Sequence, residues 1–246
     1  MVGVTTVALV ERKPGISRDL FTRYWRDVHG VMAARIPGFE SYTQHHVTPA
    51  RRGSERFEGI AIVTFADEED RRGLATSPMA AHIHRDETNV FRRALLYNLS
   101  SNAWTIEIDG RGREGATVFC VLPLGGEVGQ AIAALRGASP IHLATYDLTT
   151  GDPAGWNDTD VDEGGRSRRF GTLIETRWRS VDEGRSAASA LSDDAAVYSV
   201  DETHVMVENG RATPVGLRGF DAVATIREAA ADNQLEAEVE RALFGI

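Results

Sequence analysis

The order of strand-like and helix-like segments in the first half of the chain constrains its fold most. Four segments have the composition of β-strands, at residues 5–10, 41–47, 60–65 and 95–108. Residues 17–35 have the apolar spacing of a helix, and residues 68–85 form a second helical region that Ser77 and Pro78 interrupt. The order strand, helix, strand, strand, helix, strand is that of a ferredoxin-like unit. We therefore expect residues 1–108 to form one α+β half.

The same order returns in outline after a glycine-rich and charged linker, residues 109–115. Strand-like segments follow at residues 117–122, 141–148, 171–178 and 196–207, and helix-like segments at 128–135, 182–191 and 220–244. A ferredoxin-like sheet covers only one face with its own helices, so its other face needs a partner. We expect a diverged second half, residues 116–246, to supply that partner.

The helix expected over residues 17–35 carries a histidine beside its apolar face. Ser17 stands where a helix N-cap belongs. On a helical wheel, the residues that cluster on the core-facing side are Phe21, Trp25, Val28 and Met32. His29 lies about 80° from the centre of that cluster, where an imidazole reaches both a pocket and water. Histidine is the side chain best suited to move protons near neutral pH, although here it can instead cap carbonyls or pack against Trp25.

The strand expected over residues 41–47 carries polar groups on both faces. Its side chains alternate, so one face presents Tyr42, Gln44 and His46 and the other presents Ser41, Thr43 and His45. Buried hydroxyl, amide and imidazole groups each need a partner. One face should meet the helix that carries the histidine, unless the strand lies at an edge and shows a polar face to solvent. The sequence does not decide between the two adjacent histidines.

Four short motifs resemble those of the EthD family, which belongs to the dimeric α+β barrel superfamily. They are Arg-Lys-Pro-Gly at 12–15, Tyr-Trp-Arg-Asp-Val-His-Gly at 24–30, Pro-Gly-Phe at 37–39 and Tyr-Thr-Gln-His-His at 42–46. The similarity covers about residues 4–106 and continues through Ser77-Pro78, Asp86-Glu87 and Phe91. It implies ferredoxin-like sheets that pair into a barrel, here as two tandem halves within one chain. The second half lacks the Trp-Arg-x-x-His-Gly motif, so we expect the first half to hold the site.

The resemblance also implies which residues form that site. The residues expected to act in catalysis are His29, Tyr42, Gln44 and Asp86. The residues expected to bind the substrate are Tyr24, Trp25, His46 and Phe91. In this interpretation the histidine is the general base or acid, the tyrosine and the amide polarise a carbonyl or phenol, and the carboxylate orients a partner. Alternatively, Asp86 only caps a helix or forms a surface ion pair.

The sequence offers no convergent metal or cofactor motif. His82 and His84 fall on different helix faces, and residues 157–164 resemble a calcium loop but lack its glycine at the sixth position and its glutamate at the twelfth. Walker, dinucleotide-binding and nucleophile-elbow motifs are absent from the sequence. We therefore expect neither a metal nor a cofactor. Haem, with His29 as an axial ligand, occurs elsewhere in the superfamily, but the family resemblance does not favour it.

The composition limits the partners. A net charge of −9 argues against nucleic acid and anionic membranes, which select basic surfaces. The single cysteine, Cys120, lies in an apolar run and is expected to be a small core residue. Residues 1–10 lack the features of a signal peptide, and no segment is long and apolar enough to span a membrane, so we expect a cytoplasmic protein. Both a monomer, as an internal pseudo-dimer, and a homodimer remain open.

EthD relatives include proteins of ether degradation and enzymes that dehydrate, cyclise or cleave polyketide-like and aromatic compounds. The hypothesis for this chain is a cofactor-independent lyase (dehydratase) or cyclase that acts on a hydrophobic aromatic or polyketide-like small molecule. The alternative is a non-catalytic binding or accessory protein of a degradation or biosynthetic pathway, because fold resemblance alone does not choose between these functions.

Overall fold

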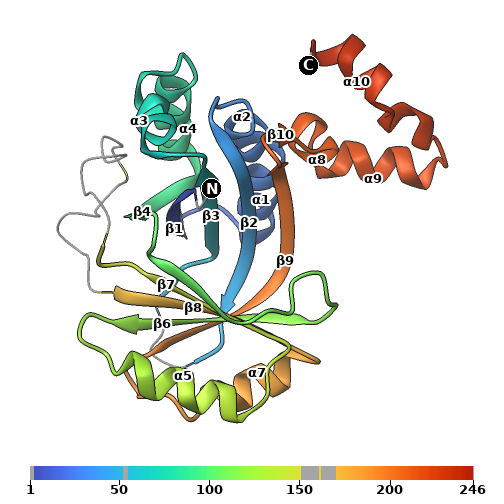
Figure 1. Cartoon of the computed structure of the whole chain (residues 1–246). Coiled ribbons are helices and arrows are strands. Elements are labelled where there is room, and N and C mark those ends of the chain that lie inside the picture. Colours follow the sequence, from blue (N-terminus) through green and yellow to red (C-terminus); the bar gives the residue numbers. More distant parts are fainter. Residues whose placement is uncertain (1–2, 52–54, 151–160, 162–169, 246) are drawn as a thin grey trace.

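The structure, a computed structural model, describes residues 3–51, 55–150, 161 and 170–245 of the chain. Its first part has the predicted element order (Figure 1). The elements are β1 (Val4–Arg12), α1 (Arg18–Tyr24), the π-helical turn η1 (Trp25–His29), α2 (Gly30–Ala33), β2 (Phe39–Pro49), β3 (Gly59–Phe65), α3 (Glu68–Thr76), α4 (Ala80–Val90) and β4 (Phe91–Leu99). The strands pair antiparallel in the order β4-β1-β3-β2, which is the ferredoxin-like arrangement.

A short strand, β5 (Trp104–Ile108), leads into the second unit. Its elements are β6 (Ala116–Pro123), α5 (Val128–Gly137), β7 (His142–Asp147), β8 (Phe170–Trp178), α7 (Val181–Ala188) and β9 (Ala196–Glu208). The strand order β9-β6-β8-β7 repeats that of the first unit. The two units therefore share one topology, although their sequences show no clear repeat.

The two units share one ten-stranded antiparallel sheet that curls between them. At one seam β2 of the first unit pairs with β9 of the second, with Tyr42 opposite Val207. At the other seam β5 pairs with β7, and the backbone N–H of Asp147 donates to the carbonyl of Ala103 at 2.6 Å. The predicted fold of two tandem ferredoxin-like halves is confirmed. The closing segment of the first half, expected at residues 95–108 as one long strand or a bent pair, forms two strands, and the second of them pairs with the second unit.

The buried apolar side chains of the described residues form three clusters. The first lies between the sheet of the first unit and its helices and includes Phe21, Trp25 and Phe65. The second fills the interior of the curled sheet and includes Phe57, Phe119 and Tyr198. The third lies under α5 and α7 and includes Cys120, Leu135 and Trp178. Cys120 is fully buried, and burial raises the pKa of its thiol to about 12, which confirms its assignment to the core.

Side-chain caps explain where several helices begin. The Ser17 hydroxyl accepts the N–H of Leu20, and the Asp67 carboxylate accepts the N–H groups of Glu69 and Asp70, as the sequence predicts. Ser77 also accepts the N–H of Ala80 at 3.2 Å, but α4 starts only at Ala80. This helix continues to Val90, five residues beyond the expected end at residue 85, so the predicted boundary was wrong.

The first long helix contains a π-turn that the helical wheel did not foresee. In η1 the N–H of Gly30 donates to the carbonyl of Trp25, five residues back. The wider turn rotates the following side chains. Val28 is therefore 46% exposed and not in the core, whereas His29 is only 7% exposed. The expectation for Val28 was wrong for this reason, and His29 lies deeper than predicted.

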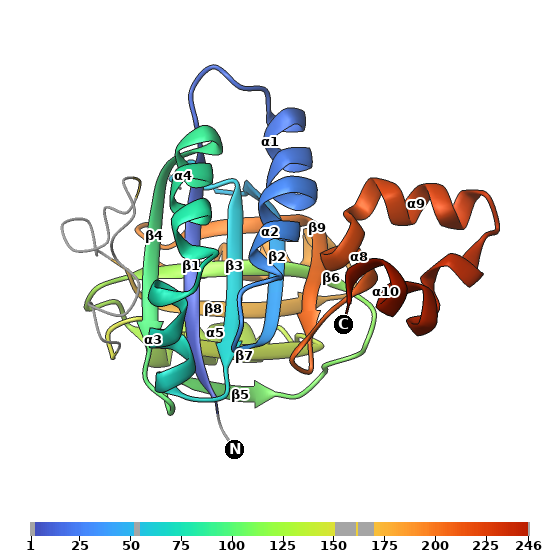
Figure 2. The same ribbon diagram turned by 90° about the horizontal axis from the view of Figure 1, so that it is seen from above.

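The chain ends in a series of short helices that project from the sheet (Figures 1 and 2). After β10 (Arg211–Ala212) come α8 (Pro214–Arg218), α9 (Phe220–Glu228), η2 (Asp232–Leu235) and α10 (Ala237–Phe244). We call residues 214–244 the C-terminal arm. No described helix has the length and apolar composition needed to cross a membrane. The calcium-like segment at 157–164 lies outside the described residues except for Val161.

Candidate active site

An apolar cavity lies in the first unit, between the sheet and the helices above it. Figure 2 shows α1, α2 and α4 lying over strands β1, β2 and β3. The cavity measures about 40 Å³, and most of its lining is aliphatic or aromatic. The lining residues with a titratable side chain are His29, Tyr42 and Glu87. The structure therefore brings three polar side chains from η1, β2 and α4 to one apolar space.

His29 is held by a carboxylate on the neighbouring helix. Its Nδ1 atom lies 2.9 Å from Oδ2 of Asp86, and the Tyr24 hydroxyl donates to the other carboxylate oxygen at 2.5 Å. Burial alone would raise the pKa of Asp86, but the hydrogen bonds from His29 and Tyr24 outweigh it and lower that pKa. Asp86 is thus a carboxylate at neutral pH. Because Nδ1 is engaged, Nε2 is the atom of His29 that remains for proton transfer.

Tyr42 is arranged as a hydrogen-bond donor. The Gln44 amide nitrogen donates to the Tyr42 hydroxyl oxygen at 2.6 Å and to the Trp25 carbonyl at 3.0 Å. A carbonyl only accepts, so the nitrogen and not the oxygen of the amide must face it. The phenol oxygen therefore accepts a hydrogen bond from Gln44 and keeps its own proton for another acceptor. Burial, together with the negative charge of Glu87, raises the pKa of Tyr42, so it stays protonated.

Two glycines let these parts approach one another. A Cβ at Gly30 would lie 2.8 Å from the Gln44 amide nitrogen and 2.8 Å from a Met206 methyl carbon. A Cβ at Gly59 would lie 2.4 Å from the Trp25 ring. All three distances are far below van der Waals contact. The packing of Trp25 on β3 therefore requires glycine at position 59, whereas a side chain at position 30 would displace the ends of the Gln44 and Met206 side chains.

Aromatic side chains form one wall of the cavity. Trp25 is 1% exposed and its ring lies 6.4 Å from that of Phe91. The Phe91 ring also lies 5.3 Å from the His29 imidazole, edge to face. Trp25 and Phe91, both expected to bind the substrate, thus line the same cavity as the histidine.

Neither histidine of β2 lines the cavity. His46 lies on the helix-facing side of the sheet but behind Trp25, with the two rings 4.7 Å apart. Burial lowers its pKa to about 3, and neither ring nitrogen has a hydrogen-bond partner among the described residues. His45 points into the interior of the curled sheet against Phe119, and burial lowers its pKa to about 4. Both imidazoles are neutral at neutral pH.

Two of the remaining predicted residues hold other side chains of the site in place. Tyr24 contacts Asp86 and Gln44 contacts Tyr42, so neither lines the cavity itself. Glu87, which the sequence showed only as the residue after Asp86 in the EthD-like pattern, does line it and is 5% exposed. The available signal was its spacing of four residues from the apolar Ile83, which places both on one helix face. His82 on the same helix is exposed. In the described part of the chain no cluster of His, Cys, Asp and Glu is arranged to hold a metal.

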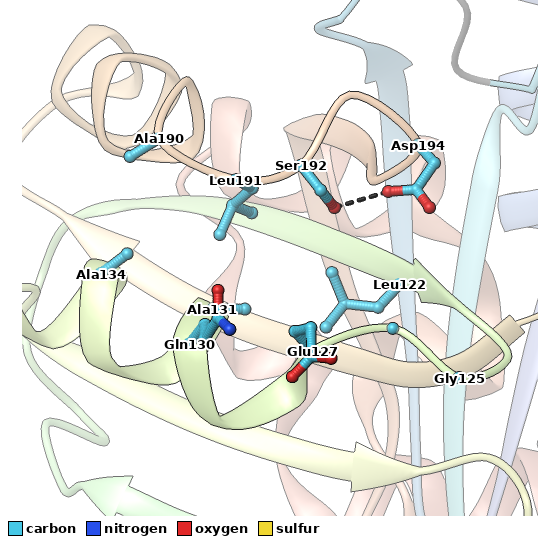
Figure 3. Close-up of a pocket in the computed structure, with 11 residues that line it drawn as sticks. Leu122, Gly125, Glu127, Gln130, Ala131, Ala134, Ala190, Leu191, Ser192 and Asp194 are labelled. Carbon is cyan, nitrogen blue, oxygen red and sulfur yellow. Dashed lines mark hydrogen bonds between the residues drawn. The ribbon is translucent and has the colours of Figure 1, made fainter.

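A larger hollow lies in the second unit, between α5 and the segment after α7 (Figure 3). Its volume is about 380 Å³. Its polar lining consists of Glu127, Gln130, Ser192 and Asp194, and the Ser192 hydroxyl donates to Asp194 at 2.5 Å. The lining has no imidazole, phenol or other aromatic ring. Despite its size, this hollow therefore lacks the imidazole and the phenol that the smaller cavity brings together.

Comparison with known proteins gives a family match for the part of the chain that carries this cavity. The family model of the EthD domain matches residues 13–93, which confirms the resemblance seen in the sequence. No curated protein matches the sequence of this chain.

Among solved structures, one supports the fold. An anthrone oxidase-like protein is 16% identical, with a TM-score of 0.50, and the match covers 87% of this chain and 97% of that protein. A putative monooxygenase from Lactobacillus acidophilus is 8% identical, with a TM-score of 0.46 over 86% of this chain and 98% of that one. A putative monooxygenase from Fusobacterium nucleatum is 10% identical, with a TM-score of 0.47 over 86% and 96%. At 16% identity the similarity to the anthrone oxidase-like protein concerns the fold and not the activity.

Proposed function

We propose, starting from the EthD domain at residues 13–93, that this chain is a lyase or cyclase for a hydrophobic aromatic or polyketide-like small molecule. The reaction is acid–base chemistry carried out by side chains of this chain, as the removal of water beside a carbonyl or a ring closure requires. His29 transfers the proton, and Asp86 holds its imidazole in position. Tyr42, which Gln44 orients, donates a hydrogen bond to a carbonyl or phenol oxygen.

The observation that carries this proposal is the hydrogen-bonded pair of His29 and Asp86 at the wall of an apolar cavity. An imidazole whose second nitrogen is held by a carboxylate has a fixed tautomer and a fixed direction of proton transfer. The walls formed by Trp25 and Phe91 match an aromatic substrate. Anionic substrates would find no lysine or arginine in this lining.

The cavity must open to admit such a substrate. Its volume of about 40 Å³ holds a few water molecules, whereas a cavity that binds benzene measures about 150 Å³. In the proposal, α4 moves away from the sheet, because it covers the cavity with Ile83 and Glu87 and is joined to α3 by only a short turn. Closure over the bound ring then excludes water from the reacting atoms.

The proposal is tested with a probe of the expected class, the bicyclic β-hydroxyketone 3-hydroxy-1-tetralone. Loss of water from this compound gives 1-naphthol, whose fluorescence reports the rate. We expect His29→Ala to lower that rate by about 10² to 10⁴-fold and to leave the affinity measured by calorimetry nearly unchanged. His82→Ala, which removes an exposed imidazole from α4, is the matched control and should turn over like the wild type.

The same experiment separates catalysis from the alternative of a binding protein. A binding protein takes up the ring compound without forming naphthol, and His29→Ala then has no turnover to lose. Equal rates for the wild type and His29→Ala would overturn the role of His29.

A further inference from the structure

The cavity contains one polar side chain that the proposed reaction has not yet used. Glu87 lies on α4 directly after Asp86, and consecutive helical residues point about 100° apart. Asp86 therefore meets His29 while Glu87 meets the cavity, together with Ile83 one turn earlier. Both carboxylates are buried, at 7% and 5% exposure.

Glu87 is also close to the group that would bind the substrate's oxygen. Its negative charge acts on the phenol of Tyr42 across the cavity. The rest of the lining is apolar apart from His29 and Tyr42. A carbonyl compound in this space would thus have a phenol, an imidazole and a carboxylate around it, each on a different element of the fold.

We infer that Glu87 is a catalytic base of this site and that His29 is the acid. Elimination of water needs two proton transfers, one from carbon and one to the leaving oxygen, and two differently placed groups perform them best. A buried carboxylate is suited to take the proton from carbon. The imidazole, with the carboxylate of Asp86 to balance its positive charge, is suited to give one. The inference rests on the proposed function and assigns the two roles within it.

The step balances without any further reactant. Glu87 takes the proton from the carbon beside the carbonyl, and the electron pair of that C–H bond forms the new C=C bond. The bond from the next carbon to its hydroxyl breaks, and the pair leaves on oxygen, which takes a proton from the His29 imidazolium and departs as water. Tyr42 stabilises the negative charge on the carbonyl oxygen. Glu87 ends protonated and His29 neutral, and one proton passing from Glu87 to His29 through solvent restores both.

Two reactions of related probes separate the two roles. In deuterium oxide, 1-tetralone exchanges the hydrogens beside its carbonyl but has no hydroxyl to lose, so exchange reports the base alone. Dehydration of 3-hydroxy-1-tetralone reports base and acid together. We expect Glu87→Gln to lower both rates by about 100-fold or more. His29→Ala should lose dehydration and keep exchange close to the wild-type rate.

Two further variants serve as controls for the loss of the Glu87 carboxylate. Glu11→Gln removes a carboxylate that is similarly buried, at 8% exposure, but lies outside the cavity, and both rates should stay at the wild-type value. Glu87→Asp keeps a carboxylate that is one methylene shorter, so it should retain exchange that Glu87→Gln has lost. Melting curves of each variant show that the loss is not one of folding.

The outcomes distinguish this inference from the proposed function. The assignment of Glu87 as base is overturned if Glu87→Gln exchanges the hydrogens of 1-tetralone at the wild-type rate. It is also overturned if His29→Ala lowers the exchange rate by about 100-fold or more. A dehydration that still depends on His29 would leave the proposed function standing. If the wild type catalyses neither reaction, both are overturned.

Discussion

Replacing Gly59 by alanine is expected to destabilise the protein through the wall of the cavity. The new Cβ would lie 2.4 Å from Cζ3 and 2.5 Å from Cη2 of Trp25, and 2.6 Å from Cγ2 of Val10. Favourable carbon–carbon separations are about 3.5–4.0 Å, so the ring and the strand must part by about 1 Å. Trp25 is 1% exposed and Val10 is 3% exposed, so neither has free solvent to move into.

The magnitude follows from two opposing terms. Overpacking a close-packed core costs about 1–3 kcal/mol. Alanine also restricts the unfolded chain, which favours the folded state by about 0.5–1 kcal/mol relative to glycine. We therefore expect the free energy of unfolding to fall by about 1–2 kcal/mol, and the melting temperature by a few degrees.

The matched control is Gly73→Ala. Gly73 lies within α3, is exposed, and a Cβ there meets nothing within 4 Å. Only the restriction of the unfolded chain acts in this variant, so its free energy of unfolding should rise by about 0.5–1 kcal/mol. Urea unfolding followed by circular dichroism measures both variants. If the free energy of unfolding changed by the same amount and in the same direction in both variants, the close packing of Trp25 on β3 would be refuted.

Three further predictions concern charge, the site and the C-terminal arm. The folded-state pKa values of His45 and His46, about 4 and about 3, lie below that of an unfolded histidine, so their neutral forms contribute stability that is fully present above about pH 6.5 and is lost as the pH falls towards those values. Below pH 6.5 each of the two histidines should lower the free energy of unfolding by about 1.4 kcal/mol per pH unit. Urea unfolding at pH 6.5 and 4.5 should therefore show a smaller loss of this free energy in His46→Phe than in the wild type. An equal loss in both proteins would contradict the burial of His46. Tyr42→Phe should slow dehydration of 3-hydroxy-1-tetralone by about 10²-fold with little change in affinity, whereas a purely structural role would lower the melting temperature and not the rate of the folded enzyme. Asp27 accepts the N–H of Phe220 at 2.6 Å, so Asp27→Ala, which removes this acceptor, should speed proteolysis within the C-terminal arm, and an unchanged cleavage rate would show that this contact does not hold the arm.

Much of the fold was predictable because apolar patterning is local. The strands and helices of both units fall close to their predicted ranges, and the Ser17 and Asp67 caps form as expected. The seams between the units were not predictable in the same way. β5 pairs with β7 of the other unit, and this choice depends on how the whole sheet curls and not on the residues of β5 alone.

The site was predictable in part, and its misses have physical causes. The motif residues His29, Tyr42, Trp25 and Phe91 do meet at one cavity. The π-turn shifts the hydrogen-bond pattern by one residue without a sequence signature, and so the wheel wrongly placed Val28 in the core and placed His29 at its edge rather than inside it. Glu87 was missed because the helix was expected to end at residue 85, which would have left Glu87 in a loop with no defined direction.

A crystal structure with 1-naphthol bound would show whether a ring compound reacts in the cavity between the first sheet and α4. We expect the naphthalene ring between Trp25 and α4, its oxygen within hydrogen-bonding distance of the Tyr42 hydroxyl, and Nε2 of His29 and the Glu87 carboxylate facing the ring. Naphthol bound instead in the hollow beside α5, with the cavity at His29 closed around its present volume, would contradict this expectation.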